Sequence, residues 1–436
     1  MTSKRSTILA AAAAAALLLS ACSGNGGGSG QNPAPSAGDT TSPATVVWST
    51  WGSPSELKRY EDFNTKFMAK HPNITVKLQS VPSYTDYHAK LLAQLTSKTA
   101  PDVFYVGDDK IGQFVDSGAL MDVTDVLKAP NAIAPYDAFN PATFGAAAND
   151  DGIFAAPNDV NPDALWYDKT ALKDAGITDD PATLAAAGKW TTDTFLAMNA
   201  KLKAKGKTGT MFWNYWATHY GWISSQGGKS YDGDTFVANT DPKSVAAVDQ
   251  LGKLFQDKTF VVADTLPSGA GADSVFISHK AGFFAQGRYT IGTIKEAGDP
   301  DNYDIVDWPS PDGTPPSTGL AASYLAINAG TKVPDAAKVF WSEFLSAEGQ
   351  KIRLSGGGNA VPSIKGADDV VLDGYPAHAQ TFLDMRDHGF VNYAAEARVP
   401  GLSSDIAEKM FLPLYQGKAT AQQTLDGVAD LIAKAK

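Results

Sequence analysis

Cysteine is nearly absent from this chain of 436 residues, which contains only Cys22. One cysteine cannot form a disulfide within the chain, and a cysteine-ligated zinc site is excluded for the same reason. The six histidines, at positions 71, 88, 219, 279, 378 and 388, follow no metal-ligand spacing. We therefore assign neither a metal nor a cofactor to the sequence, and we expect packing to carry the stability.

Positive charge is also scarce, since 36 Lys and Arg face 47 Asp and Glu and give a formal net charge of −11. No basic stretch interleaved with aromatic residues offsets this charge, so nucleic acid is not an expected partner. The segment Gly227-Gly228-Lys229-Ser230 has Ile223 where a P-loop needs its first glycine. A Gly-x-Ser-x-Gly elbow does not occur. We therefore expect a protein that is not an enzyme.

Long apolar runs are limited to Ile8–Leu19, which is shorter than the ~20 residues that span a bilayer. Lys4 and Arg5 precede this run and small residues follow it, which is the pattern of a secretory signal peptide over residues 1–21. Leu19-Ser20-Ala21-Cys22 resembles a bacterial lipobox, which implies a lipidated (palmitate-bearing) Cys22 and an extracytoplasmic, membrane-anchored protein. Residues 22–43 are rich in Gly, Ser and Pro and predict a flexible tether.

An alternation of strands and helices begins at about residue 44. Residues 45–50 form a β-branched strand, and Ser53 to Glu56 form a capping box before a helical pattern. A strand at 74–78, a helix at 87–95 and a strand at 102–106 follow. This β-α-β-α-β order predicts a parallel sheet, with ligands bound beyond the carboxyl ends of its strands. The candidate ligand-binding residues at these ends are Trp51, Gly52, Asp108 and Asp109.

The rest of the chain continues the α/β pattern, and its length indicates two domains. Helical patterns occur at 163–175, 192–205, 241–257, 334–346, 403–415 and 420–435. Short strand-like runs occur at 274–279, 282–285, 303–308 and 323–328.

The segment 151–169 resembles the lobe crossover of solute-binding proteins of bacterial carbohydrate ABC importers. In that family a glycine turn, a strand and a proline precede a stretch like Leu165-Trp166-Tyr167-Asp168-Lys169. Segments 190–193, 282–289, 308–319 and 334–350 fit the same family in the same order. The resemblance implies a two-lobed, periplasmic-binding-protein-like α/β fold that closes on a sugar and presents it to a membrane permease.

The resemblance also implies how the lobes are built. We expect lobe I to comprise residues 44–157 and about 290–330, and lobe II about 158–289 and 331–436. Chain crossings are expected near Pro157, Gly287 and Ala329. The protein is expected to be a monomer.

Sugar binding needs planar rings for the C–H faces and short polar side chains for the hydroxyl groups. Trp213, Trp216 and Trp222 crowd into one segment that borders the cleft in the family, whereas Trp48, Trp166, Trp190 and Trp341 fit core positions. The other candidates lie at the crossovers and in glycine-containing loops; they are Asn158, Asp159, Arg288, Tyr289, Trp308, Gly319, Gly357 and Gly358. Each has a structural alternative, such as a turn, a helix cap or core packing.

Two other functions stay open at this stage. A secreted glycan-active enzyme would turn over an oligosaccharide, and a surface lectin or adhesin would bind one without changing shape. An importer receptor should close on its ligand, because the permease must distinguish the ligated state.

Overall fold

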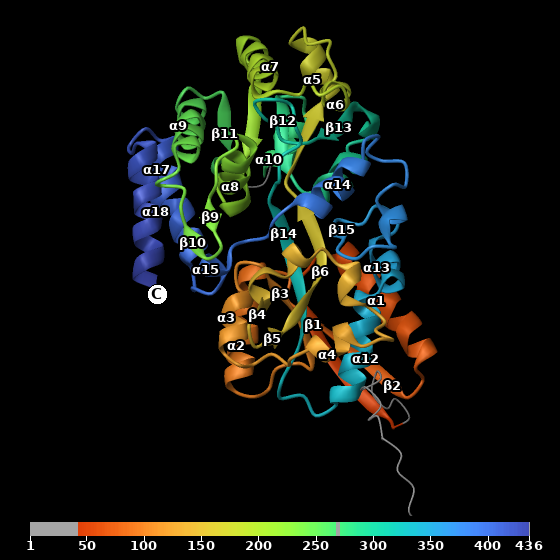
Figure 1. Ribbon diagram of the computed structural model, residues 1–436. Coiled ribbons are helices and arrows are strands. Elements are labelled where there is room, and N and C mark those ends of the chain that lie inside the picture. Colours follow the sequence, from red (N-terminus) through yellow and green to blue (C-terminus); the bar gives the residue numbers. More distant parts are fainter. Residues whose placement is uncertain (1–41, 267–270, 436) are drawn as a thin grey trace, which may run out of the picture. The chain divides into compact units, whose positions relative to one another are not determined.

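The computed structural model describes residues 42–266 and 271–435. The predicted signal peptide, Cys22 and nearly all of the tether lie outside the described residues. The described residues belong to one compact unit, in which most strands fall into two separate sheets (Figure 1).

The first sheet has the strand order β15-β6-β14-β3-β1-β2. Its strands are β1 (Ala44–Thr50), β2 (Ile74–Ser80), β3 (Val103–Gly107), β6 (Ala155–Pro162), β14 (Leu320–Ile327) and β15 (Val361–Pro362). β1 pairs in parallel with β2 and β3, whereas β14, β6 and β15 add in antiparallel fashion. We call this sheet and its helices lobe I.

Local sequence signals account for the start of lobe I. β1 ends at Thr50, and Ser53 caps α1 (Pro54–Lys70) in a capping box with Glu56. The predicted β-α-β-α-β unit is confirmed, because α2 (Tyr84–Thr96) follows β2 and leads to β3. The remaining helices of this lobe are α3 (Ile111–Asp116), α4 (Thr124–Lys128), α12 (Pro334–Leu345) and α13 (Ala347–Leu354).

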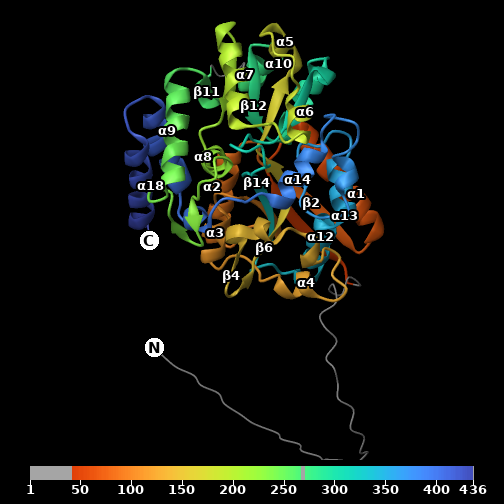
Figure 2. The ribbon, with the colours of Figure 1, turned by 45° about the horizontal axis from the view of Figure 1, so that its top comes forward.

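The core of lobe I is aromatic. Trp48 is fully buried, and its ring centroid lies 5.0 Å from that of Phe344 and 5.5 Å from that of Tyr60. Phe344 belongs to α12, which packs with α13 against α1 and β1. Figures 1 and 2 both show α1, α12 and α13 side by side.

The second sheet has the order β11-β8-β12-β7-β13, and with its helices it forms lobe II. Its strands are β7 (Ala164–Asp168), β8 (Thr208–Phe212), β11 (Phe260–Val262), β12 (Ala281–Gln286) and β13 (Tyr303–Val306). Helices α5 (Lys169–Asp174), α6 (Pro181–Ala186), α7 (Thr192–Ala204), α8 (Trp216–Ser225), α9 (Pro242–Gln256), α10 (Gly271–Ile277) and α11 (Ile291–Glu296) lie along this part of the chain.

Small elements complete the fold. Two short hairpins are formed by β4 (Ala148–Asn149) with β5 (Gly152–Ile153) and by β9 (Tyr231–Asp232) with β10 (Thr235–Phe236). The C-terminal part contains α14 (Gln380–His388), α15 (Ala394–Ala397), α16 (Leu402–Asp405), α17 (Leu412–Tyr415) and α18 (Ala421–Ala435), with a π-helical segment at Ile406–Phe411. α17 and α18 pack on α9 of lobe II. Both views show α18 beside α9 (Figures 1 and 2).

The chain crosses between the sheets three times, and none of the crossings lies at an expected position; near Gly287 the chain stays in lobe II, because β12 and β13 both belong to the second sheet. The first is at Asp163, between β6 and β7, rather than near Pro157. The second is residues 307–319, before β14, because β14 runs back into the first sheet and Ala329 lies past its far end. The third follows α14, which packs on β6 and β15.

The predicted lobe limits need two corrections. Residues 290–306 belong to lobe II rather than lobe I, because β12 before them and β13 at their end are both strands of the second sheet. Residues 334–362 contain α12, α13 and β15, which pack on lobe I although lobe II was expected. In both cases the pattern of each element is local, whereas its sheet is chosen by long-range packing.

Two predictions of element type are also wrong. Residues 274–279 fall mostly in helix α10 rather than in a strand, and the predicted helix at 163–175 begins with the buried strand β7. β7 is buried throughout and carries no clear period, and the run at 274–279 is too short for spacing to separate a helix from a strand. Among residues 42–266 and 271–435, no helix has the length and apolar character to span a membrane.

Candidate ligand-binding cleft

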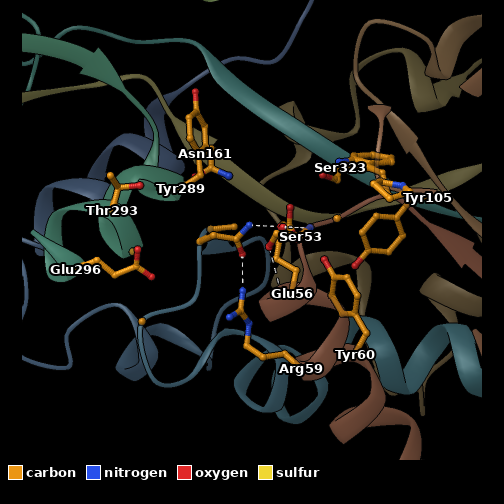
Figure 3. A pocket seen from close by; sticks show the side chains of 18 residues that line it. Ser53, Glu56, Arg59, Tyr60, Tyr105, Asn161, Tyr289, Thr293, Glu296 and Ser323 are labelled. Atoms are coloured by element: carbon orange, nitrogen blue, oxygen red, sulfur yellow. Dashed lines mark hydrogen bonds between the residues drawn. The ribbon is translucent and has the colours of Figure 1, made fainter. Parts of the chain in front are cut away.

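A cavity of about 720 Å³ in volume opens between residues of the two lobes. Lobe I contributes its β1–α1 turn, β3, β14 and the loop before β15, and lobe II contributes the segment from Tyr289 to Glu296. Figure 3 shows Thr293 and Glu296 on one side and Tyr60, Tyr105 and Glu56 on the other. The cavity therefore has one wall from each lobe.

An aromatic ring stands at the mouth of the first strand. Trp51 is half-buried and lines the cavity, and its ring centroid lies 4.9 Å from that of Tyr84 and 5.6 Å from that of Tyr105. Both neighbours meet it edge-on, which fixes the orientation of the indole. Gly52 follows with φ +151°, a backbone conformation that side chains disfavour, and lets the turn enter α1 directly.

Polar side chains of the first turns of α1 line the same wall. Glu56 accepts a hydrogen bond from the backbone N of Ser53 at 2.7 Å and another from Asn359. Arg59 donates to Oδ1 of Asn359 at 3.1 Å. Asn359 thereby ties the α1 wall to the loop before β15, and these bonds are drawn in Figure 3.

Asp159 places a carboxyl group at the back of the cavity. It is only 7% exposed, and burial raises its pKa to about 6 although the Arg353 guanidinium opposes the rise. Nη1 of Arg353 lies 3.8 Å from Oδ2 of Asp159, and the Asn158 amide donates to the same oxygen at 2.7 Å. The carboxyl therefore has a buried counter-charge behind it and the cavity in front.

The wall that lobe II contributes to the cavity is less apolar than the wall from lobe I. Tyr289 is 41% exposed beside Asn161, and one turn of α11 supplies Gly292, Thr293 and Glu296. Asn161 accepts a hydrogen bond from the backbone N of Arg288 at 2.8 Å. The crossing strand β6 and the turn that precedes α11 are thus joined at the floor of the cavity.

A smaller cavity of about 180 Å³ also takes residues from both lobes. Its lobe I wall holds Tyr84, Asp108 and Asp109; the Tyr84 hydroxyl donates to Asp109 at 2.5 Å. Burial, together with the neighbouring Asp109 carboxylate, raises the pKa of Asp108 to about 7. Lobe II contributes Asn214, Tyr215, Trp216, Ser403, Ser404 and Ala407. Because Tyr84 packs on Trp51, the two cavities are neighbours.

Eight of the candidate residues line one of these cavities. Trp51, Gly52, Asp159, Tyr289 and Gly357 line the larger, and Asp108, Asp109 and Trp216 line the smaller. Their contact with a ligand stays a prediction.

Four other candidates are interior residues, which corrects the expectation for them. Trp222 and Trp308 are at most 1% exposed and pack on each other at 6.2 Å, so both rings belong to the core of lobe II. Asn158 is fully buried beside Asp159. Arg288 is also buried and donates to the carbonyl groups of Gly358, Ala360 and Val370, so it binds backbone of lobe I instead of facing the cavity.

Three candidates line neither cavity. Trp213 is half-buried and donates to Gln286 at 3.2 Å. A Cβ on Gly319 would lie 2.5 Å from that of Ala217, and one on Gly358 would lie 2.4 Å from the carbonyl O of Leu354. Both glycines are therefore needed for close packing.

Several lining residues were missed at the sequence level: Ser53, Glu56, Arg59, Tyr60, Pro82, Tyr105, Asn161, Tyr215, Gly292, Thr293, Glu296, Ser323, Asn359 and Ala360. Some signals were available. Glu56, Arg59 and Tyr60 recur at helical spacing directly after Trp51, and Asn161 lies two residues after Asp159 on one strand, hence on the same face. The loop residue Asn359 offered no such signal.

Residues 51–351 match the family of bacterial extracellular solute-binding proteins. The chain belongs to this family. Members of the family are binding proteins that act outside the cytoplasm, not enzymes. The match confirms the family and the two-lobed α/β fold predicted from the sequence.

Solved structures of solute-binding proteins share the fold. The ABC substrate-binding protein Lmo0181 from Listeria monocytogenes, in complex with cycloalternan, has a TM-score of 0.76 at 19% identity, over 90% of this chain and 98% of that one. The sugar-binding protein MalE from Xanthomonas citri has a TM-score of 0.75 at 18% sequence identity, and the match covers 89% of this chain and 98% of that one. The GacH receptor of Streptomyces glaucescens, solved with acarbose, has a TM-score of 0.73 at 19% sequence identity, and the match covers 90% of this chain and 100% of that one.

Proposed function

We propose that this solute-binding protein captures a di- or oligosaccharide and delivers it to the membrane permease of an ABC importer. The observation that carries the proposal is the composition of the larger cavity. A tryptophan ring held edge-on by other rings faces a space that also presents carboxyl, amide and hydroxyl groups from both lobes. This combination suits a sugar, whose ring faces are apolar and whose rim donates and accepts hydrogen bonds.

The size and relatives of the site support the same function. A cavity of about 720 Å³ is within the range of pockets that enclose whole small ligands. Solved structures with this fold hold cycloalternan, acarbose and maltose. We infer that the cargo here is a carbohydrate of comparable kind.

The mechanism we propose is lobe closure. Each wall of the cavity belongs to a different lobe, so rotation about the three crossings would bring Thr293 and Glu296 toward the Trp51 wall. Closure buries the ligand and gives the permease a distinct shape to recognise. A lectin or adhesin would need no such change.

We also propose that the mature protein is a monomer, lipid-anchored through Cys22 after removal of a signal peptide. The lipobox-like sequence Leu19-Ser20-Ala21-Cys22 supports the lipid anchor. Cys22→Ser should release the protein from the membrane fraction and abolish incorporation of a labelled fatty acid. Unchanged membrane retention would contradict lipid anchoring.

The binding function is tested by thermal shift and calorimetry against mono-, di- and oligosaccharides. A ligand that binds only the folded state must raise the melting temperature. Trp51→Ala should then weaken binding by roughly 1 to 3 kcal/mol, because the ring supplies both area and geometry.

Trp213→Phe is the matched control, since Trp213 is a half-buried tryptophan that lines neither cavity. It should leave affinity unchanged. Equal affinity for wild type and Trp51→Ala would remove the stacking role, and binding without compaction in small-angle scattering would favour a lectin. No response to any sugar would reject a carbohydrate cargo.

A further inference from the structure

A buried histidine contacts residues that line each of the two cavities. His88 of α2 is 4% exposed and itself lines neither cavity. Its Nδ1 lies 2.8 Å from the carbonyl O of Tyr84, one helical turn earlier, and its Nε2 lies 3.1 Å from the backbone N of Gly107. A carbonyl O can only accept and a backbone N–H can only donate, so the ring is neutral, with its proton on Nδ1 and a lone pair for Gly107 on Nε2. Burial lowers the pKa of His88 to about 4, which agrees with a neutral ring at pH 7.

The bond to Gly107 holds the turn that carries two candidate ligand contacts. Gly107 ends β3 and is followed by Asp108 and Asp109, which line the smaller cavity. The Tyr84 hydroxyl donates to Asp109 at 2.5 Å, and it passes so close to Gly107 that a Cβ there would lie 1.7 Å from the hydroxyl O. His88 therefore binds Tyr84 through one nitrogen and the start of the turn through the other, while Tyr84 binds the end of the turn.

The same imidazole supports the aromatic ring of the larger cavity. The Trp51 ring centroid lies 5.2 Å from that of His88, and the Tyr84 ring packs on both, at 4.9 Å from Trp51 and 4.3 Å from His88. Tyr87, whose hydroxyl is bonded to the backbone of β1 and β3, meets the imidazole edge-on at 5.1 Å. The imidazole is thus enclosed by three rings, and a change in its position would reach Trp51 directly.

Resting on the proposed function, we propose that His88 is a positioning residue for sugar binding. Through Nε2 it holds the turn from Gly107 to Asp109, and through its ring it supports the Trp51 indole, so one side chain sets the lobe I surface of both cavities. Loss of the Nε2 acceptor leaves a buried N–H unpaired, and the turn must move to find another partner. The ligand then meets carboxyl groups that are out of place, and affinity falls.

Two substitutions distinguish the bond to Gly107 from the rest of the side chain. His88→Gln places an amide oxygen near the position of Nε2, where it can accept from Gly107, whereas His88→Asn ends near the position of Nδ1 and cannot. Both variants lack the ring, so a difference between them reports the bond to Gly107 alone. We expect His88→Asn to bind at least tenfold more weakly than His88→Gln.

Affinity is measured by calorimetry with neutral oligosaccharides of glucose, galactose, mannose and xylose, two to four units long, and with acarbose; the tightest binder of the wild type is the probe. Urea unfolding of the same variants gives their stability. A histidine with only a structural role would lower the free energy of unfolding in both variants and leave the affinity of the folded protein unchanged.

Support of the indole is tested by combining His88→Gln with Trp51→Ala. His88→Gln alone should weaken binding about three- to fivefold through loss of the ring, and this loss should disappear in the Trp51→Ala background, because no indole is left to support. His388→Asn is the control. His388 makes the same Nδ1 contact with a carbonyl O four residues earlier, at 2.8 Å, but it is exposed and lines neither cavity. It should leave affinity unchanged.

The outcomes separate this proposal from the proposed function. Equal affinity in His88→Gln and His88→Asn, with sugars still binding the wild type, overturns the role of the bond to Gly107 and leaves the sugar receptor intact. A loss from His88→Gln that persists in the Trp51→Ala background overturns the support of Trp51. No binding of any sugar by the wild type overturns both proposals.

Discussion

Replacing Arg353 with methionine tests the electrostatic design of the cavity's back wall. Arg353 is 1% exposed, and its Nη2 donates to the carbonyl O of Phe344 at 3.2 Å. Its guanidinium lies 4.1 Å from the Phe344 ring centroid and 3.8 Å from Oδ2 of Asp159. Methionine keeps the apolar stem of the side chain but removes the charge that opposes the raised pKa of Asp159.

The expected loss is about 3 to 5 kcal/mol in the free energy of unfolding at pH 7.5, the usual cost of leaving one partner of a buried ion pair behind. The double variant Arg353→Met/Asp159→Asn should recover part of this loss, because it leaves no buried charge. The single variant should also depend on pH. Without Arg353, the folded-state pKa of Asp159 rises further above its unfolded value of about 3.8. The loss of stability caused by the unpaired carboxylate is therefore full above the folded-state pKa and shrinks as the pH falls below it.

The assay is urea unfolding followed by tryptophan emission at pH 7.5 and pH 5. Lys58→Met serves as a surface control, since Lys58 and its partner Asp62 are both exposed, and it should change stability by less than about 0.5 kcal/mol. Equal losses in the single and double variants, or a loss in the single variant that does not shrink at pH 5, would refute the coupling between Arg353 and Asp159.

Two further predictions concern stability. Gly112→Ala should lower the free energy of unfolding by about 1 to 3 kcal/mol, because its Cβ would lie 2.6 Å from Cγ of Arg398. Gly292→Ala is the control, since its Cβ would meet nothing within 4 Å. In urea unfolding it should be neutral or stabilise the protein by up to ~1 kcal/mol. His219 is buried on the Phe411 ring, and burial lowers its pKa to about 3. Stability from neutral His219 is full above pH ~6.5 and is lost as pH falls, so the wild type should lose roughly 3 kcal/mol relative to His219→Gln between pH 6.5 and 4. Parallel pH profiles would refute this.

The sequence predicted those parts of the fold that local signals determine. β1 and α1 are one example, because a β-branched run and the capping box from Ser53 to Glu56 specify both elements without reference to the rest of the chain. α9 is another, with its cap at Asp241 and a proline at the first turn. The resemblance to a known family supplied the two-lobed arrangement.

Burial of the aromatic residues was harder to predict. Trp51 and Trp308 both stand near the end of a strand and next to a turn, yet only Trp51 lines a cavity. Trp308 is enclosed by Phe212 and Trp222, which come from β8 and α8. These neighbours lie about ninety positions earlier in the sequence, so no local pattern around Trp308 indicates that its ring faces inward.

Arg288 illustrates how burial and mechanism are linked. It follows β12 of lobe II but binds three carbonyl groups in the loop of lobe I that surrounds β15. The indole of Trp166 donates to the carbonyl O of Gly287, and Asn161 accepts from the backbone N of Arg288. These bonds tie the end of β12 to the first crossing and to lobe I at once. A rotation that preserves them must have its axis close by, so the Tyr289 end of the cavity would move least and the parts of lobe II far from Arg288 would move most.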